Sequence, residues 1–301
     1  MVLPAGTWST VLDFLCNKFP RIPAEEWQAR MQRGDVLDVA GQALALGTRY
    51  TPHSKVFYYR ALEAEPRIPF EETVLFQDAY LVVANKPHFL PVTPSGAYLQ
   101  ETLLVRLKRK LNLPDLAPLH RIDRETAGLV LFAIQPHTRA AYQNLFRDRQ
   151  VTKHYEAIAG FRADLELPLT RASRLQDGAQ FMQMQEVPGE ANSETRIELL
   201  RQGEGDRAGY ALYLLKPLTG QKHQLRVHMA ALGLGIVNDT MYPDFLPSGQ
   251  PETPDYSKPL QLLAKRIEFV DPISQEQRIF ESNEMLYVES YLAAAEQQYS
   301  C

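Results

Sequence analysis

The sequence predicts an α+β fold with a mixed, mainly antiparallel central sheet flanked by helices, together with a small N-terminal α/β module. Several β-rich segments follow one another with no helical segment between them, which favours antiparallel pairing over a doubly wound parallel sheet. A proline-bearing linker at residues 64–72 (AEPRIPFEE) separates this pattern from a shorter one before it. We therefore predict a module over residues 1–65 and a larger domain over residues 66–301.

The N-terminal module begins with two short amphipathic segments, residues 11–19 and 24–34, which have the spacing of helices. The glycine-punctuated stretch at 35–50 predicts a turned strand pair. This order resembles the small RNA-binding module named after a protein of the small ribosomal subunit, but few basic residues are present. An RNA-binding module and a purely structural cap both remain open.

The larger domain begins with a β-rich run at residues 73–87, which ends in the turn residues Asn85, Lys86 and Pro87. Further strands are predicted at 128–134, 154–160, 193–200, 209–217 and 265–271, and helices at 98–111, 137–149 and 221–232. The strands outnumber the helices that separate them, as an α+β domain requires.

Charge is distributed unevenly along the chain. The net charge of the 301 residues is −4, yet the stretch from Leu104 to His154 holds ten Lys and Arg against four Asp and Glu. That stretch carries +6 and the remainder −10. A basic stretch alone is typical of a solvated surface, and it indicates a polyanion partner only together with a chemical motif.

The composition excludes several classes of protein. No apolar run approaches the roughly 18 residues of a membrane span, and the first residues lack a secretion signal, so we expect a cytoplasmic protein without membrane contact. Cys16 and Cys301 lie at opposite ends of the chain and form neither a disulfide framework nor a CxxC metal pair. No phosphate-binding P-loop is present, and we expect no cofactor and no metal.

The most informative segment is residues 119–133 (LHRIDRETAGLVLFA), in which a charged loop runs into an apolar strand. Asp123 lies in this loop between Arg121 and Arg124. Neighbouring guanidinium groups lower the pKa of a carboxyl group, and an ionised carboxylate can act as a covalent nucleophile. The alternative is a loop ion-pair network without chemistry.

Two further segments carry candidate site residues. Residues 218–233 (LTGQKHQLRVHMAALG) predict a helix whose apolar face holds Leu225 and Met229, with Arg226 pointing away from the core. His223 and His228 are five residues apart, which argues against a shared metal ion. Arg226 could also be an ordinary surface cation near a helix end.

The third segment, residues 151–160 (VTKHYEAIAG), predicts a strand with Lys153, Tyr155 and Ala157 on one face. A tyrosine beside a nucleophile could stack on a nucleobase. It could equally be a half-buried aromatic residue of the sheet.

In order and identity, these segments resemble the pseudouridine synthases of the RluA type, from about Glu72 to Val270. HRIDRETAG is similar to the family pattern HR-L-D-x-x-T-S-G, with Ile122 in place of Leu and Ala127 in place of Ser. The resemblance implies a pseudouridine-synthase-like catalytic domain and an isomerase that converts uridine to pseudouridine in RNA. It makes Asp123 the catalytic aspartate, Tyr155 the active-site tyrosine and Arg226 the basic partner of the aspartate.

The resemblance also implies an RNA surface. Arg121 matches the arginine that takes the space of the extruded base, and the other expected RNA contacts are His120, Arg124, Lys153, Lys222 and His223. The chain departs from the family at three positions, with Gln221 for Arg, Asn238 for Gly and Leu263 for His. Gln221 weakens an expected phosphate contact.

The implied reaction begins with flipping the uridine out of its stack. Asp123 then attacks the sugar or the ring, and the sequence leaves both open. The expected partner is ribosomal or transfer RNA, with no obligate protein partner and a monomeric enzyme. Two alternatives remain: an RNA-binding or chaperone protein of the same fold, and a hydrolase that uses Asp239 as a second carboxylate.

Overall fold

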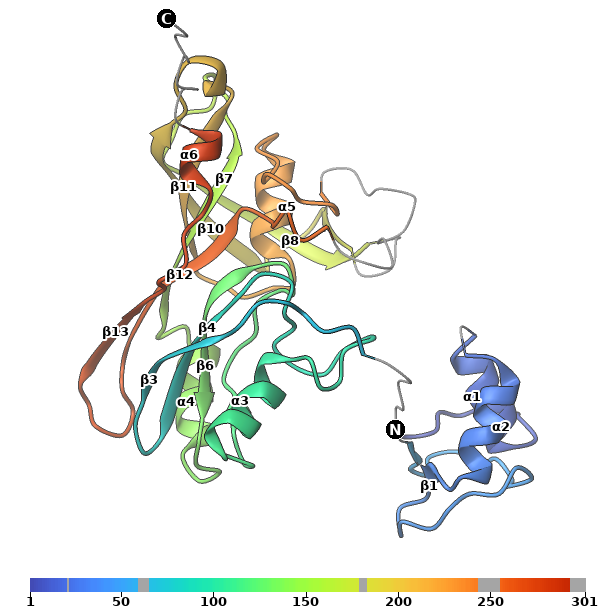
Figure 1. Ribbon diagram of the computed structural model, residues 1–301. Helices are drawn as coiled ribbons and strands as arrows, with labels where there is room; N and C mark the ends of the chain where they lie inside the picture. The colour runs from blue at the N-terminus through green and yellow to red at the C-terminus, as the bar shows by residue number, and fades with distance from the viewer. Residues whose placement is uncertain (21, 59–64, 179–182, 243–254, 293–301) are drawn as a thin grey trace, which may run out of the picture. The chain divides into compact units, whose positions relative to one another are not determined.

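The computed structural model describes residues 1–20, 22–58, 65–178, 183–242 and 255–292 (Figure 1). The chain divides into two compact units, Met1–Ala64 and Glu65–Cys301, and each has a hydrophobic core of its own.

The first unit contains two helices and a two-stranded antiparallel sheet. These are α1 (Val11–Lys18), α2 (Ala24–Gln32), β1 (Val36–Leu37) and β2 (Phe57–Tyr58). α1 begins with a capping box in which the side chains of Thr10 and Asp13 each accept the backbone N–H of the other. The helices bury Phe14, Leu15 and Trp27 between them and the sheet.

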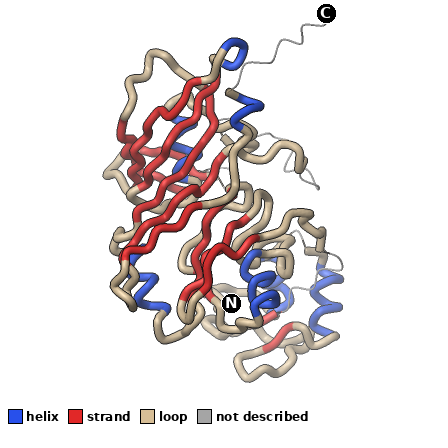
Figure 2. The backbone as a smooth tube through the Cα atoms, turned by 60° about the vertical axis from the view of Figure 1, so that its left-hand side comes forward, coloured by secondary structure: helices blue, strands red, loops and turns tan. Residues whose placement is uncertain are grey.

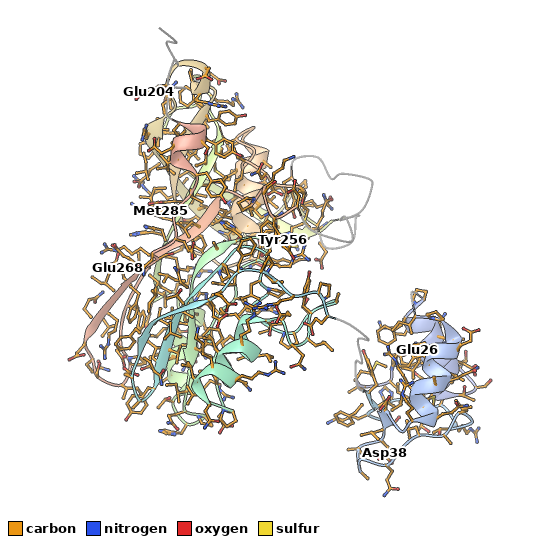
Figure 3. The ribbon with its side chains drawn as sticks, viewed as in Figure 1. Glu26, Asp38, Glu204, Tyr256, Glu268 and Met285 are labelled. Atoms are coloured by element: carbon orange, nitrogen blue, oxygen red, sulfur yellow. The ribbon has the colours of Figure 1, made fainter. Side chains whose placement is uncertain are left out.

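The cations of α2 are engaged within the first unit. Nε of Arg30 lies 2.7 Å from Oε1 of Glu26, a residue labelled in Figure 3, and its guanidinium lies 5.2 Å from the centre of the Trp27 ring. Nε of Arg33 lies 3.0 Å from a carboxylate oxygen of Asp35. These pairs reduce the positive charge that α2 can offer to a polyanion. RNA binding by this unit stays a prediction.

The second unit is built on one mixed sheet of eleven strands, which Figure 2 shows as a continuous twisted band. Its strands are β3 (Thr73–Gln77), β4 (Leu81–Lys86), β5 (Ala117–Pro118), β6 (Ala127–Ala133), β7 (Thr152–Gly160), β8 (Leu169–Asp177), β9 (Met184–Val187), β10 (Ser193–Gln202), β11 (Tyr210–Pro217), β12 (Leu262–Val270) and β13 (Gln277–Glu281). The order is β3-β4-β6-β12-β7-β11-β10-β8-β9, with β5 on β6 and β13 on β12. Among the described strands of this sheet, β6 and β12 pair in parallel and the other pairs are antiparallel. The predicted α+β class is confirmed.

Helices cover both faces of the β4–β6 half of the sheet. They are α3 (Leu103–Leu111) and α4 (Arg139–Arg147). Val82 and Ala84 of β4 belong to the core that includes α3, whereas Leu81 and Val83 belong to the core that includes α4. Successive residues of a strand face opposite sides, so the unbroken apolar run of β4 reflects burial on both faces.

The other half of the sheet carries α5 (Gln224–Ala231) on one face and the short α6 (Val288–Tyr291) on the other. Leu225 and Met229 of α5 pack against Tyr213 and Leu215 of β11. α5 was predicted over residues 221–232, and it begins three residues later because His223 takes the N-cap position with a left-handed backbone, φ 53°. The predicted glycine at its end is Gly233, φ 71°.

β5, β8, β9 and β13 were absent from the predicted strands. Much of β8 is exposed, so its sequence, LTRASRLQD, mixes charged and apolar residues. It therefore lacks the apolar run by which the predicted strands were recognised. Similarly, the helix predicted from residue 98 begins at Leu103, where the hydroxyl of Thr102 caps it by accepting the N–H of Val105 at 3.3 Å.

A close approach between β6 and β12 holds the centre of the sheet together. Gly128 has φ 112°, and a Cβ atom at this position would lie 2.3 Å from the carbonyl oxygen of Ala264. Only glycine fits this backbone. Ala264 in turn pairs with Tyr155 of β7, so the approach brings β6 and the loop before it close to Tyr155.

Candidate active site

Asp123 lies in the loop between β5 and β6, and buried groups hold this loop at both ends. On one side, Nε2 of His120 accepts the N–H of Leu131 at 3.2 Å, and its ring stacks on Phe146 with 4.8 Å between ring centres. Burial, and then the charge of Lys153, lower the pKa of His120 to about 3, so its ring is neutral and able to accept.

On the other side of the loop lies Lys86, which is fully buried at the end of β4. Its Nζ donates to the carbonyl oxygen of Arg124 at 3.0 Å and to that of Pro87 at 2.9 Å. Burial lowers the pKa of Lys86 to about 7, although the charges of Glu125 and Asp123 oppose this. Lys86 thus fixes the backbone next to Asp123 by its hydrogen bond to the carbonyl oxygen of Arg124.

Arg226 is the centre of the charge arrangement. Its Nε and Nη2 bind the two carboxylate oxygens of Asp239 at 2.8 and 2.7 Å, and its Nη1 lies 3.5 Å from Oδ2 of Asp123. Nη1 also lies 3.9 Å from a carboxylate oxygen of Glu125. Burial alone would lower the pKa of Arg226, but hydrogen bonds and the charges of these carboxylates raise it above its ordinary value.

The prediction that Arg226 points away from the core is wrong. Its side chain is 1% exposed. The helical spacing correctly separates Arg226 from the apolar face of α5, but a separate segment containing Asp239 covers this second face. A buried guanidinium is tolerated there because carboxylates on several sides compensate its charge.

Asp239, which the sequence offered only as the second carboxylate of a hydrolase, supports Arg226 instead. Its carboxylate is fully buried, and Oδ1 also accepts the backbone N–H groups of Met241 and Tyr242 at 2.8 and 3.1 Å. Since every described contact of this carboxylate is internal, Asp239 is not available to a substrate. This finding removes its suggested role as the second acid of a hydrolase.

His223 connects Asp123 to Tyr242. Its Nδ1 lies 2.9 Å from the Tyr242 hydroxyl, and its Nε2 lies 3.9 Å from Oδ1 of Asp123. That hydroxyl already accepts the N–H of Met184 at 2.7 Å, so its own proton is free to point at Nδ1. Burial lowers the pKa of His223, so its ring is neutral, and a hydrogen bond accepted at Nδ1 from Tyr242 would leave the ring hydrogen on Nε2, on the side of Asp123.

Tyr155 occupies the middle of β7 and is half-buried. Burial, and then the negative charge of Asp123, raise the pKa of its hydroxyl, so the free enzyme keeps a neutral phenol there. Tyr155 therefore adds no second negative charge to the surroundings of Asp123.

The remaining predicted residues lie around this centre. Arg121 is exposed and Arg124 pairs with Glu125 at 2.8 Å. Nζ of Lys153 donates to the carbonyl oxygen of Thr219 at 3.0 Å, and Nζ of Lys222 lies 3.9 Å from Asp177. The structure thus gathers Asp123, Tyr155, His223 and Arg226 from three separate segments, and roles in RNA binding stay predictions.

The three departures from the family pattern are accommodated locally. Gln221 donates from its side chain to the carbonyl oxygen of Asn192 at 3.3 Å. Asn238 has φ 62°, a left-handed conformation that glycine prefers and asparagine tolerates. Leu263 is fully buried in β12 beside Ala127.

Among the described residues, no group of three or more His, Cys, Asp and Glu side chains could hold a metal ion. Within the same residues, no helix is long and apolar enough to cross a membrane.

A family model described as RNA pseudouridylate synthase matches residues 80–231, a range that includes Asp123, Tyr155 and Arg226. The chain belongs to the RNA pseudouridylate synthase family. It is therefore an isomerase that forms pseudouridine in RNA, and the predicted enzyme class is confirmed. The matched range ends before Asp239 and Tyr242. These two residues belong to the site but lie outside the range that the family model matches.

Relatives of this synthase agree with the RluA type. The tRNA pseudouridine synthase C of Pasteurella multocida is 32% identical over 217 residues, which cover 68% of this chain and 88% of that protein. The dual-specificity RNA pseudouridine synthase RluA of the same organism is 28% identical over 225 residues, covering 70% and 92%. The solved structure of human RNA pseudouridylate synthase domain containing 1 shares the fold, with a TM-score of 0.58, 23% identity and coverage of 73% and 86%.

Proposed function

We propose that this RNA pseudouridylate synthase isomerises specific uridines in a structured transfer or ribosomal RNA, with Asp123 as the nucleophile. The observation that carries this assignment is the contact of Arg226 with three carboxylates of unequal exposure. The side chain of Asp123 is 25% exposed, that of Glu125 is 18% exposed and that of Asp239 is fully buried. Asp123 is therefore the carboxylate best placed to meet a substrate.

The reaction requires an ionised carboxylate. Converting uridine to pseudouridine breaks the bond between the ribose and N1 of uracil, rotates the base and rejoins it through C5. Nη1 of Arg226 lies 3.5 Å from Oδ2 of Asp123, and Nε2 of His223 lies 3.9 Å from its Oδ1, so nitrogen groups face both oxygens of this carboxylate. Attack on the sugar and attack on the uracil ring both begin from this same charged carboxylate.

The uracil must leave its stack before it can reach Asp123. Flipping costs a few kcal/mol, and an exposed cation or ring that fills the gap offsets part of that cost. We assign this role to Arg121, which is exposed two residues before Asp123. Tyr155 would stack on the flipped uracil, with its hydroxyl available near C5 when the C5 proton leaves.

Tritium release from RNA labelled at C5 of uridine tests this assignment. Purified protein is incubated with labelled transfer RNA and with labelled ribosomal RNA fragments. We expect wild type to release tritium from one of them and Asp123→Asn to release none, because the amide has no nucleophilic oxygen anion. Asp115→Asn is the matched control, since Asp115 is an exposed aspartate on the surface. Equal release by Asp123→Asn and wild type would disprove the assignment.

The same experiment separates catalysis from binding alone. A chaperone of the same fold would bind RNA without releasing tritium, and Asp123→Asn would leave its biological role intact. The relatives named above are all synthases, which does not favour this alternative. We further propose that the protein is a cytoplasmic monomer and needs no cofactor, metal or protein partner. Sedimentation of the active protein would test the monomer, and activity in the presence of a chelator would test the independence from metal.

A further inference from the structure

The end of α4 and the start of β7 carry two cations, Arg149 and Lys153, that no carboxylate neutralises among the residues the structure describes. Arg149 is exposed and adopts a left-handed backbone, φ 57°, directly after the helix. Lys153 is half-buried, and its Nζ has a carbonyl oxygen as its described partner, that of Thr219. Arg149 was not among the predicted site residues.

Lys153 lies on the active-site side of the sheet. Lys153 and Tyr155 are two residues apart on β7, so they share a face and are separated by about 6.6 Å along the strand. The charge of Lys153 reaches the His120 ring, which supports the Asp123 loop. A group bound at Lys153 would therefore lie within one nucleotide's reach of a base on Tyr155.

The cation pair is unfavourable in the free protein. Burial, and then the charge of Arg149, lower the pKa of Lys153 to about 8. Enclosed cations are ordinarily compensated by acidic neighbours, as Arg226 is by Asp239. By contrast, Arg147, two residues before Arg149, is paired with Asp148 at 2.8 Å. Like charges that no internal carboxylate compensates are suited to an anion supplied from outside.

We propose that Arg149 and Lys153 bind a backbone phosphate of the substrate RNA next to the flipped uridine. This inference rests on the proposed function. The two cations would bind the RNA backbone and take no part in the chemical steps. Phosphate contacts set the position and register of a nucleic acid, and they carry no sequence information. The pair would thus hold the strand while the uridine rotates into the site.

The test measures the dissociation constant of the RNA from which wild type releases tritium, at several salt concentrations. We expect Arg149→Gln and Lys153→Met each to weaken binding about tenfold, the equivalent of one charge-assisted hydrogen bond. The slope of log Kd against log salt concentration should fall by about one for each variant. Arg147→Gln, the control, should bind like wild type because its charge is already paired.

Unchanged binding and an unchanged salt slope in both variants would overturn the proposal. So would an equal loss in Arg147→Gln, because the effect would then be one of general surface charge. Arg149 is exposed, so we expect Arg149→Gln to fold like wild type. This variant therefore tests the proposal even if Lys153→Met fails to fold. If wild type releases no tritium, the proposed function fails, and the same salt series on any bound RNA still decides the phosphate site.

Discussion

Asp239 binds the guanidinium of Arg226 through both carboxylate oxygens, at 2.8 and 2.7 Å, and both side chains are enclosed by protein. This ion pair leaves Nη1 of Arg226 directed at Asp123. The orientation of the Arg226 guanidinium is thus set by a residue whose side chain is fully buried.

Replacing Asp239 should therefore damage both the fold and the reaction. Asp239→Ala leaves a buried arginine without its main partner, which costs about 3–5 kcal/mol of unfolding free energy. Urea denaturation measures this cost. Asp164→Ala is the control, since Asp164 pairs with Arg162 on an exposed surface, and we expect it to unfold like wild type. Comparable stability of the two variants would contradict a structural role for Asp239.

Arg226→Lys should lose activity although it keeps the positive charge. A single ammonium cannot bind both oxygens of Asp239 and also reach Asp123. A misplacement of about 1 Å at a reacting centre can cost about 100-fold in rate. Single-turnover tritium release measures the rate. A rate within twofold of wild type would mean that charge alone, without the fork geometry, is sufficient.

Tyr242→Phe should affect Asp123 indirectly. The change removes the hydroxyl at Nδ1 of His223, so the ring is free to move its hydrogen from Nε2 and turn a lone pair toward Asp123. We expect slower single-turnover tritium release, because the ring hydrogen that faces Asp123 is no longer held in place. An unchanged rate would show that the tyrosine does not set the tautomer of His223.

Gly128→Ala should destabilise the centre of the sheet. The added Cβ would meet the Ala264 carbonyl oxygen at 2.3 Å, and the backbone has φ 112°. We expect a loss of at least about 2 kcal/mol from strain and displacement of β12. Gly209→Ala, where no atom lies within 4 Å of the added Cβ, provides the comparison in the same denaturation series. A stable Gly128→Ala protein would show that β6 and β12 can separate without cost.

Stability should fall below pH 6.5, and His228 is one of the histidines responsible. This buried ring is held between the hydroxyls of Ser193 and Thr195, and burial lowers its pKa from 6.5 to about 4. The unfolded chain then binds the proton more readily than the folded one between pH 6.5 and 4, so acid favours unfolding in this window. We expect a loss of about 2 kcal/mol between pH 7 and pH 5 from this residue. His228→Gln should reduce the slope by this amount, and an equally steep curve would exclude His228 as a contributor.

Much of this enzyme could be predicted from local patterns. The α+β class followed from successive β-rich segments, and the RluA type followed from the contiguous stretch at residues 119–133. Tyr155 and Arg226 were recognisable because each lies in a short segment of family-like sequence. Strand and helix periodicity operates over a few residues, so the sequence displays it directly.

The predictions failed where partners come from distant parts of the chain. Arg226 looked exposed because helical spacing cannot reveal that Asp239, thirteen residues later, covers that face. Its contact with Asp123 spans 103 residues, and the pairing of Ala264 with Tyr155 spans a comparable distance.

The sequence alone therefore determined the chemical groups of this protein and the local elements that carry them. Tertiary structure decided that Arg226 is buried and that Asp239 and Tyr242 complete the site. The physical reason is that burial and charge compensation depend on which segments pack together, and packing is a property of the whole folded chain.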